Sequence, residues 1–147
     1  MNITLQPITK DNWKQATKLK LEEHQTHFVA PNWYSILQTL YQDFESWAYG
    51  IYDGEGMVGF AMIGYDAEHA EHWIVRLMVD KDHQKKGYGR AAMHALIEMF
   101  RSKPDCNAIF ISFEPDNIVA QKLYASLGFE DINRIDEGEL VYRLTLT

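Results

Sequence analysis

Gln84-Lys85-Lys86-Gly87-Tyr88-Gly89-Arg90 is the stretch that indicates both the fold and the chemistry of this chain. It lies between an apolar strand predicted at residues 72–79 and an amphipathic helix predicted at residues 87–103. Its glycines let a ligand come close to the main chain, and the free N–H groups at the helix start form an anion site with the helix dipole. Its two lysines and its arginine add positive charge, so the stretch indicates a bound polyphosphate, with a solvated glycine turn as the alternative.

The segments on either side of this stretch show strand or helix periodicity. A hairpin turn is predicted at residues 54–56, a C-terminal helix cap at Gly128, and an N-cap of the second helix at Asn32 or Ser35. The predicted strands lie at residues 3–8, 47–53, 57–65, 72–79, 107–113, 129–134 and 139–146, and the predicted helices at 9–24, 34–43, 87–103 and 117–127. The order β-α-α-β-β-β-α-β-α-β-β predicts an α/β protein, a mixed sheet with helices on its faces, in a single domain over residues 1–147.

The composition is that of an acidic protein. A net charge of −7 at pH 7 argues against a nucleic-acid partner, because phosphate binding needs clustered Lys and Arg. A negative field attracts cationic ligands, although solubility alone also accounts for it. The single cysteine, Cys106, allows no disulfide within the chain and suits a reducing compartment. No signal-peptide pattern or long apolar stretch is visible, so we expect a cytoplasmic protein with no membrane partner.

Two other phosphate-binding patterns can be compared with the glycine turn. The Walker pattern is absent, but residues 87–92 match the G-x-G-x-x-A dinucleotide pattern. Glu114 ends the next predicted strand, where a ribose-binding acid would lie. A dinucleotide-dependent oxidoreductase is therefore a rival interpretation. That motif normally follows its strand directly, whereas residues 80–86 intervene here, and the chain has no room for a substrate domain.

Three segments together resemble the GNAT superfamily of N-acetyltransferases. Gln84-x-x-Gly87-x-Gly89 is similar to the [QR]-x-x-G-x-[GA] acetyl-CoA signature of that family. The preceding Trp73-Ile74-Val75-Arg76-Leu77-Met78-Val79-Asp80 resembles its central strand. Downstream, Asn117-x-x-Ala120-x-x-Leu123-Tyr124-x-x-Leu127-Gly128-Phe129 resembles its second signature, and the order of elements matches from end to end. The resemblance implies a GNAT fold and an acetyl-CoA-dependent N-acetyltransferase.

The resemblance also implies how the cofactor is held. Backbone N–H groups of the glycine turn would bind the CoA pyrophosphate, with Gln84 shaping the turn. The main chain of the central strand would pair with the pantetheine arm like an added strand, and the N–H of Val79 or Met78 would face the thioester oxygen. Asn117, also a plausible helix N-cap, would contact the pantetheine arm. The implied cofactor-binding residues are Leu77, Met78, Val79, Gln84, Lys85, Lys86, Gly87, Tyr88, Gly89, Arg90, Asn117 and Tyr124.

Tyr124 is the residue that the resemblance places near the sulfur atom. Its hydroxyl could protonate the departing thiolate, while a core tyrosine with a satisfied hydroxyl is the alternative. The acceptor amine, with a pKa near ~10, must lose a proton before it attacks. Many family members carry a carboxylate near the position of Val75 or Arg76, and this chain has none there. Candidates for the general base are Glu71, Glu23, His24 and His72, and the residues expected at the catalytic centre are Tyr124, Val79 and Glu71.

Cysteine and histidine offer no second chemistry. Cys106 lies at the start of a predicted strand, and the sequence places no general base beside it, so it is not expected to carry an acyl group. His24-x-x-His27 and His69-x-x-His72 come without cysteine or a persuasive carboxylate set, so no metal is expected.

The acceptor is expected to be a small cationic amine. The loop region at residues 22–34 combines carboxylates with aromatic side chains, which suits a cation, whereas a solvated helix end beside a packing cluster is the alternative. The whole-chain pattern, including residues 28–32 and Gly138-Glu139, resembles bacterial polyamine and diamine (spermine/spermidine) acetyltransferases. Other amines, such as an aminoglycoside, an amino-acid derivative or a protein N-terminus or lysine, stay open, as does a non-catalytic CoA sensor. A homodimer is a further expectation. The expected substrate-binding residues are Glu22, Glu23, His24, Phe28, Trp33 and Tyr34.

Overall fold

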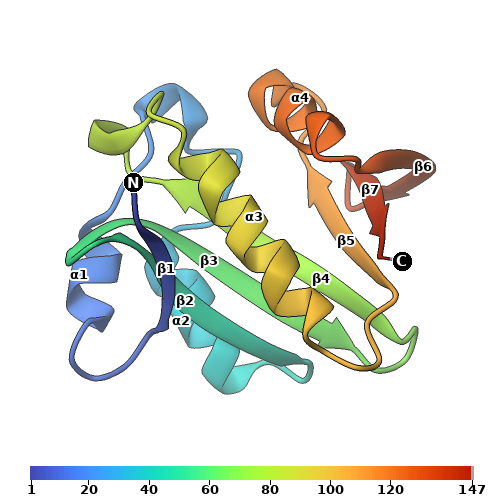
Figure 1. Ribbon diagram of the computed structural model, residues 1–147, viewed down its shortest axis with the longest axis horizontal. Coiled ribbons are helices and arrows are strands. Elements are labelled where there is room, and N and C mark those ends of the chain that lie inside the picture. Colours follow the sequence, from blue (N-terminus) through green and yellow to red (C-terminus); the bar gives the residue numbers. More distant parts are fainter. Residues whose placement is uncertain (147) are drawn as a thin grey trace.

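Seven strands form one mixed sheet in the computed structural model, which describes residues 1–146 (Figure 1). Their order in the sheet is β1-β2-β3-β4-β5-β7-β6, and within the described residues β4 and β5 are the one parallel pair. The strands are β1 (Ile3–Pro7), β2 (Glu45–Asp53), β3 (Gly56–Asp66), β4 (Glu71–Val79), β5 (Ala108–Phe113), β6 (Glu130–Asp136) and β7 (Glu139–Thr145). The helices are α1 (Trp13–Lys18), α2 (Asn32–Tyr41), α3 (Tyr88–Arg101) and α4 (Ile118–Ser126), with short 3₁₀ helices η1 (Glu23–Gln25) and η2 (Lys81–His83).

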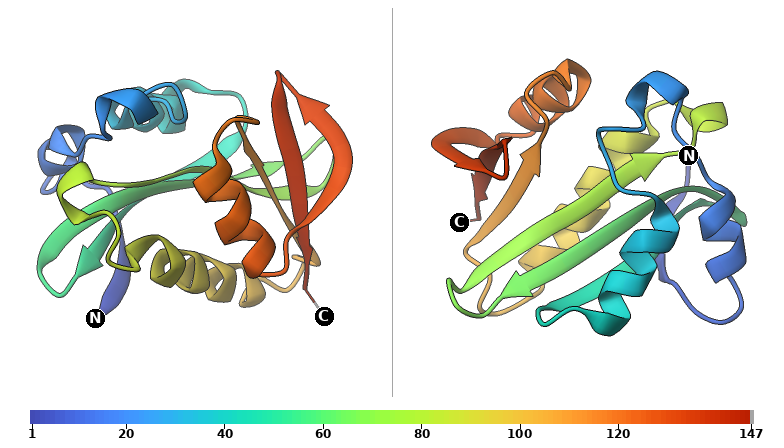
Figure 2. Two further views of the ribbon diagram at one scale, coloured as in Figure 1. Left: turned by 90° about the horizontal axis from the view of Figure 1, so that it is seen from above. Right: turned by 180° about the vertical axis from the view of Figure 1, so that it is seen from behind.

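Helices cover both faces of the sheet (Figure 2). On one face α3 and α4 enclose a core in which Leu96 of α3 packs with Ile109 of β5. On the other face α1 and α2 cover a second core that includes Ala16 and Phe60. Neighbouring strand residues point to opposite faces, so Phe60 enters the second core and Ala61 the first. No helix within residues 1–146 is long and apolar enough to cross a membrane.

The predicted order of elements is confirmed, together with the mixed sheet flanked by helices. The turn at residues 54–56 joins β2 and β3 as a hairpin. Asn117 caps α4, because its side-chain oxygen accepts the N–H of Ala120 at 3.2 Å. Gly128 follows the same helix with a φ of +99°, a conformation that favours glycine at this position.

The first helix is shorter than the predicted span of residues 9–24. It covers Trp13–Lys18, and extended chain then leads to η1. Lys20 explains the difference, because its N–H donates to the Asp80 carboxylate at 2.9 Å and its carbonyl accepts the N–H of Lys81 at 2.7 Å. Both backbone groups of Lys20 are therefore used in a contact with the connection between β4 and α3, so they cannot extend the helix.

The predicted cap of the second helix is wrong as well. Pro31 holds the N-cap position, and Asn32 is already the first residue of α2. The buried Asn32 side chain donates to the carbonyl of Ala16 at 2.9 Å, which ties α2 to α1. Ser35 is buried one turn further on, so both side chains serve packing rather than capping.

β4 and β5 separate after a short stretch of pairing. The parallel register joins His72 to Ile109, Trp73 to Phe110 and Ile74 to Ile111. β4 nevertheless continues to Val79, and β5 to Phe113. β4 stays paired with β3 up to Val79, with an irregularity that leaves Val75 unmatched. From Val75 onward, the edge of β4 that faces β5 therefore has no strand partner within the described residues, and a gap opens in the sheet.

Gly59 of β3 permits the close approach of β4 beside this gap. A Cβ atom at Gly59 would lie 2.5 Å from the carbonyl oxygen of Met78 and 3.1 Å from Cδ1 of Ile51. Gly59→Ala should therefore lower the free energy of unfolding by about 1–3 kcal/mol, because overpacking forces the backbone to move. Gly56→Ala in the same strand is the matched control, since its nearest neighbour would be 3.8 Å away. Urea denaturation measures both variants, and equal stabilities would contradict the expected clash.

Candidate active site

The backbone of β4 directs alternate residues toward the gap. The N–H of Asp80 donates to a carbonyl of β3 at 2.8 Å, whereas the carbonyl of Val79 accepts from the Gln84 side chain at 3.0 Å. Backbone groups of successive strand residues point to opposite edges, so Val79 and Leu77 face the gap and Met78 faces β3. Of the two N–H groups expected to meet a thioester oxygen, that of Met78 therefore points away from the gap. The N–H of Leu77, which the sequence did not suggest for this role, points into it.

The turn between β4 and α3 leaves the start of α3 open to an anion. Gly87 is the N-cap with a φ of +87°, and Lys85 also adopts a positive φ of +64°. No side chain of the described residues caps α3, so the N–H groups of its first turn are available to a ligand. Gln84 braces this turn, because its amide nitrogen donates to the side chain of Gln25 at 2.9 Å and to Val79 at 3.0 Å. Gln84 therefore ties the turn both to η1 and to β4.

The side chains of the turn have different surroundings. Lys85 and Lys86 are exposed, so their charges stand free beside the helix start. Arg90 donates to a serine hydroxyl of α4 at 2.9 Å and links α3 to α4. Tyr88 donates to an aspartate of β2 at 2.6 Å, so its hydroxyl is turned away from the anion site. At Gly89 a Cβ atom would be in ordinary van der Waals contact with Leu123 at 3.7 Å and Val79 at 4.0 Å, so the start of α3 packs beside both β4 and α4.

Tyr124 reaches the gap from α4. Its ring packs against Phe113 and Phe129, with ring centroids 5.5 and 6.0 Å away. The side chain is buried and also lines the pocket next to the gap. Burial raises the pKa of the Tyr124 hydroxyl, and the negative charge of Glu139 raises it further. Tyr124 is therefore protonated at neutral pH and has a proton to give.

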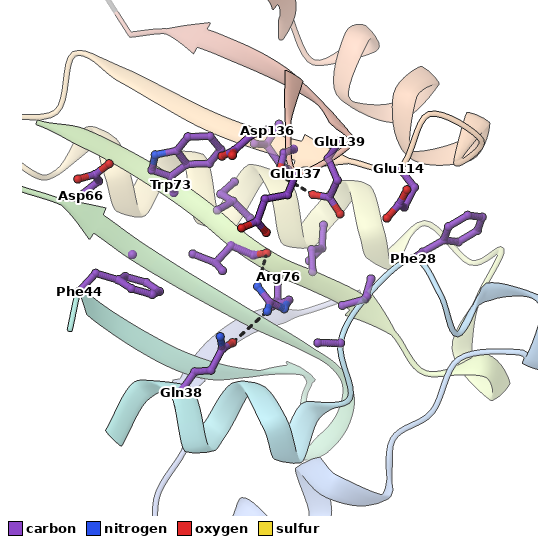
Figure 3. Close-up of a pocket in the computed structure, with 18 of the residues that line it drawn as sticks. Phe28, Gln38, Phe44, Asp66, Trp73, Arg76, Glu114, Asp136, Glu137 and Glu139 are labelled. Atoms are coloured by element: carbon purple, nitrogen blue, oxygen red, sulfur yellow. Dashed lines mark hydrogen bonds between the residues drawn. The ribbon is translucent and has the colours of Figure 1, made fainter. Parts of the chain in front are cut away.

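A pocket of about 1010 Å³ opens beside the gap, between α2 with its preceding loop, β4 and the β6–β7 hairpin (Figure 3). Leu77 and Tyr124 both line it, so the pocket meets the gap where these residues are exposed to it. Two guanidinium groups line the pocket, those of Arg76 and Arg134. The carboxylates that line it are those of Asp66, Glu114, Asp136, Glu137 and Glu139. The pocket is therefore acidic in balance and suits a ligand with several positive charges.

The pocket contains part of the predicted substrate set. Phe28 and Tyr34 line it. The exposed Glu22, Glu23, His24 and Trp33 are not among its lining residues. Glu22 instead caps η1 by accepting a backbone N–H with its side chain.

The carboxylates of the pocket were missed because they come from other parts of the chain. Glu114 directly follows β5, and Asp136, Glu137 and Glu139 belong to the hairpin formed by β6 and β7. Glu139 is fixed there by the hydroxyl of Ser112, which donates to it at 2.7 Å. The sequence feature that could have indicated them is the group of acidic residues on both sides of Gly138. Their place at the pocket follows only from the sheet order, in which β7 lies between β5 and β6.

Glu71, expected as the general base, is engaged in an ion pair. Nη1 and Nη2 of Arg134 lie 2.9 and 3.1 Å from its two oxygens, and the indole N–H of Trp73 donates to one of them at 3.3 Å. The Glu71 side chain is 13% exposed. Proton transfer to Glu71 would therefore require the ion pair to open first.

Arg76 takes the central position where the family resemblance placed a carboxylate. Its guanidinium donates to Gln38 at 2.9 Å and to the carbonyl of Val75 at 3.2 Å, which are both neutral groups. Burial lowers the pKa of Arg76, and the negative charge of Glu139 raises it again in part. Glu139 therefore acts electrostatically on both Arg76 and Tyr124.

The fold is that of N-acetyltransferases, as comparison with solved structures shows. The PaiA N-acetyltransferase of Thermoplasma acidophilum, solved with coenzyme A, superposes with a TM-score of 0.74 at 12% identity, over 99% of this chain and 100% of that one. The spermidine N-acetyltransferase of Vibrio cholerae, solved with CoA and spermine, also has a TM-score of 0.74, at 15% identity over 99% of this chain and 95% of that one.

The chain belongs to the acetyltransferase (GNAT) family, whose model matches residues 5–129. Two curated relatives from Bacillus subtilis match over 96% of this chain and 97% of their own length. They are a probable spermine N(1)-acetyltransferase of subspecies natto, at 29% identity, and a spermine/spermidine N(1)-acetyltransferase of strain 168, at 28% identity. The expected family and enzyme class, an N-acetyltransferase, are thereby confirmed.

Proposed function

We propose that this N-acetyltransferase moves the acetyl group of acetyl-CoA to a primary amine of a polyamine or diamine such as spermine or spermidine. The observation that carries the proposal is the acidic pocket, which meets the gap in the sheet at Leu77 and Tyr124. A polyamine presents several ammonium groups, of which one reacts while carboxylates hold the others. The names of the two Bacillus relatives support the same acceptor class.

Acetyl-CoA would be held along the gap. The open start of α3 and the exposed Lys85 and Lys86 suit the pyrophosphate. The backbone edge of β4 offers Val79 and Leu77 to the amide groups of the pantetheine arm, in the manner of an added strand. Asn117 lies at the start of α4, on the opposite border of the gap, where its free side-chain N–H₂ could contact the arm.

The N–H of Leu77 is the group that we propose for the thioester oxygen. Both Leu77 and Val79 face the gap, but Leu77 lines the acceptor pocket together with Tyr124. Val79 lies nearer the glycine turn, since its Cγ2 would be 4.0 Å from a Cβ atom on Gly89. A backbone N–H fixed by the pairing of β4 with β3 stabilises the oxyanion without reorganisation.

Glu139 and Tyr124 then divide the proton transfers. Glu139 takes a proton from the acceptor ammonium, and the free amine attacks the carbonyl carbon to form the C–N bond. When the C–S bond breaks, the Tyr124 hydroxyl protonates the CoA thiolate and recovers a proton from the nitrogen, which becomes a neutral amide. We favour Glu139 over Glu71 as the base because Glu71 holds Arg134 with both of its oxygens.

Arg76 favours a second acceptor class, an amine that also carries a carboxylate. Its guanidinium is half-buried and has only neutral hydrogen-bond partners among residues 1–146, so a ligand carboxylate could form a direct ion pair with it. The two classes are separated by comparing kcat/KM for lysine, which carries a carboxylate, with kcat/KM for cadaverine, which does not. A higher value for lysine that is lost in Arg76→Gln would support the carboxylated amine, and a higher value for cadaverine would contradict it.

Binding of CoA tests the proposal that acetyl-CoA is the cofactor. CoA should raise the melting temperature by mass action, whereas NAD at equal concentration should not. Gly89→Asp should abolish the shift, because it adds bulk and negative charge at the open helix start. Asn107→Asp, an exposed site beyond the far end of α3, adds the same charge and should keep the shift. Thermal scans decide, and stabilisation by NAD alone would revive the dinucleotide interpretation.

Removal of the Tyr124 hydroxyl tests the proton donor. Tyr124→Phe keeps the ring packing, so the fold should persist while kcat falls by about 10²–10⁴-fold. Tyr142→Phe is the matched control, since Tyr142 is buried in the same core and its hydroxyl accepts from Gln121 instead. Glu139→Gln should lower kcat by a similar factor. Steady-state thiol release measures all three, and a folded Tyr124→Phe variant with parental turnover would remove Tyr124 from the mechanism.

The salt dependence of kcat/KM tests whether the acceptor is a polyamine that the pocket's carboxylates attract. The kcat/KM for spermidine should exceed that for butylamine, and added salt should reduce the difference by screening the carboxylates. Joint Asp136→Asn and Glu137→Gln substitution should raise KM for spermidine by about 2- to 30-fold, the sum of two exposed charge contacts. Joint Glu22→Gln and Glu23→Gln substitution removes the same charge outside the pocket and should leave KM unchanged. Equal efficiency for both amines at every salt concentration would refute a polyamine acceptor while leaving the acetyltransferase.

A further inference from the structure

Arg134 of β6 is held at one end of the pocket in the way that a bound cation would be. Its guanidinium makes a two-pronged contact with Glu71, at 2.9 and 3.1 Å. Its Cζ atom lies 5.5 Å from the centre of the Trp73 ring and 5.7 Å from the centre of the Phe110 ring. A carboxylate combined with two aromatic rings is also the chemistry that binds an alkylammonium ion.

The surroundings of this cation site stay negative even with Arg134 in place. The hydrogen bond to Glu71 raises the pKa of Arg134, and the negative charges of Glu71, Asp136 and Asp66 raise it further. Glu71 is largely buried, so without Arg134 it would be a carboxylate in need of another cation. The Glu71–Trp73–Phe110 site is therefore complete as an ammonium site, and the chain fills it with a side chain of its own.

The site lies at the far end of the pocket from the acetyl group. Trp73 and Leu77 are four residues apart on β4, which corresponds to roughly 13 Å at about 3.3 Å per residue. Figure 3 shows Trp73, Asp66 and Asp136 at one end of the pocket and Glu114 and Phe28 at the other. An acceptor whose reacting nitrogen is at Leu77 approaches Arg134 only if its chain is long, and a further ammonium at that distance then meets a guanidinium of like charge.

We propose that Arg134 sets the length of the acceptor by occupying the ammonium site formed by Glu71, Trp73 and Phe110. This inference rests on the proposed polyamine function and adds a specificity residue to it. With Arg134 present, the pocket ends before this site, and the distal ammonium of a short polyamine pairs with Glu137. When the guanidinium is removed, the additional ammonium of a longer polyamine takes its place.

The test compares kcat/KM for putrescine, spermidine and spermine with acetyl-CoA. Arg134→Ala should raise the spermine-to-putrescine ratio by about 5- to 30-fold, the gain expected for one ammonium on a carboxylate and two aromatic rings. Arg134→Lys keeps a cation on the site and should retain the parental ratio. In Arg134→Ala with Glu71→Gln the ratio should rise less, because the aromatic rings remain while the buried charge is gone. This double variant also leaves no unpaired buried carboxylate, so it gives an answer if Arg134→Ala does not fold.

The outcomes separate the two proposals. Turnover of none of the three amines by the parent enzyme, with turnover of another amine, would refute the polyamine function and this inference with it. Turnover by the parent, combined with parental ratios in Arg134→Ala or in the double variant, would overturn the length inference alone. A second readout is the melting temperature without acetyl-CoA: spermine should stabilise Arg134→Ala more than it stabilises the parent, and putrescine should stabilise both equally.

Discussion

The separation of β4 from β5 is the constraint on which the rest of the site depends. β4 pairs with β5 at three residues, His72, Trp73 and Ile74. After Ile74, β4 remains paired only with β3. An unpaired strand edge in the middle of a sheet leaves backbone N–H and C=O groups without ladder partners, which is costly unless water or a ligand satisfies them. The hydrogen bond from Gln84 to the Val79 carbonyl satisfies one of these groups and shows which edge is open. The gap is thus both the cofactor path that we propose and the reason why a ligand should stabilise the fold.

The two ends of this gap have opposite electrostatic character. At the glycine turn, the open start of α3 and two exposed lysines present positive charge in a chain whose net charge is −7. On the pocket side, carboxylates from β3, β5 and the β6–β7 hairpin outnumber the two arginines. The polyanionic cofactor and the polycationic acceptor that we propose can therefore approach from different sides and meet at Leu77 and Tyr124, which both line the pocket.

Local patterns were enough to predict the order of the elements, but contacts between distant segments were not predictable. The α4 cap at Asn117 and the turn at Gly128 follow from residues within a few positions of each other, and both predictions are confirmed. The first helix was predicted too long, because the contact of Lys20 with Asp80 and Lys81 spans about sixty residues. The sequence predicts substrate-binding residues at 22–34, whereas the carboxylates that line the pocket come from later parts of the chain. In the sequence, the residues around Glu137 and Glu139 predict only a turn between two strands. The strand order β5-β7-β6 brings this hairpin beside the gap.

The charges around Glu139 couple the two proton transfers that the reaction needs. Burial raises the pKa of Tyr124, and the charge of Glu139 raises it further while that carboxylate is ionised, so the hydroxyl is protonated before the reaction starts. Arg76 lies within the field of the same carboxylate, whose negative charge partly offsets the lowering of its pKa by burial. In the mechanism that we propose, Glu139 loses its negative charge when it accepts the proton of the acceptor ammonium, and its contribution to the raised pKa of Tyr124 disappears. Tyr124 therefore becomes a stronger acid at the stage when the CoA thiolate departs. The mechanism that we propose therefore does not require a carboxylate on β4, since Glu139 of β7 acts electrostatically on both Arg76 and Tyr124.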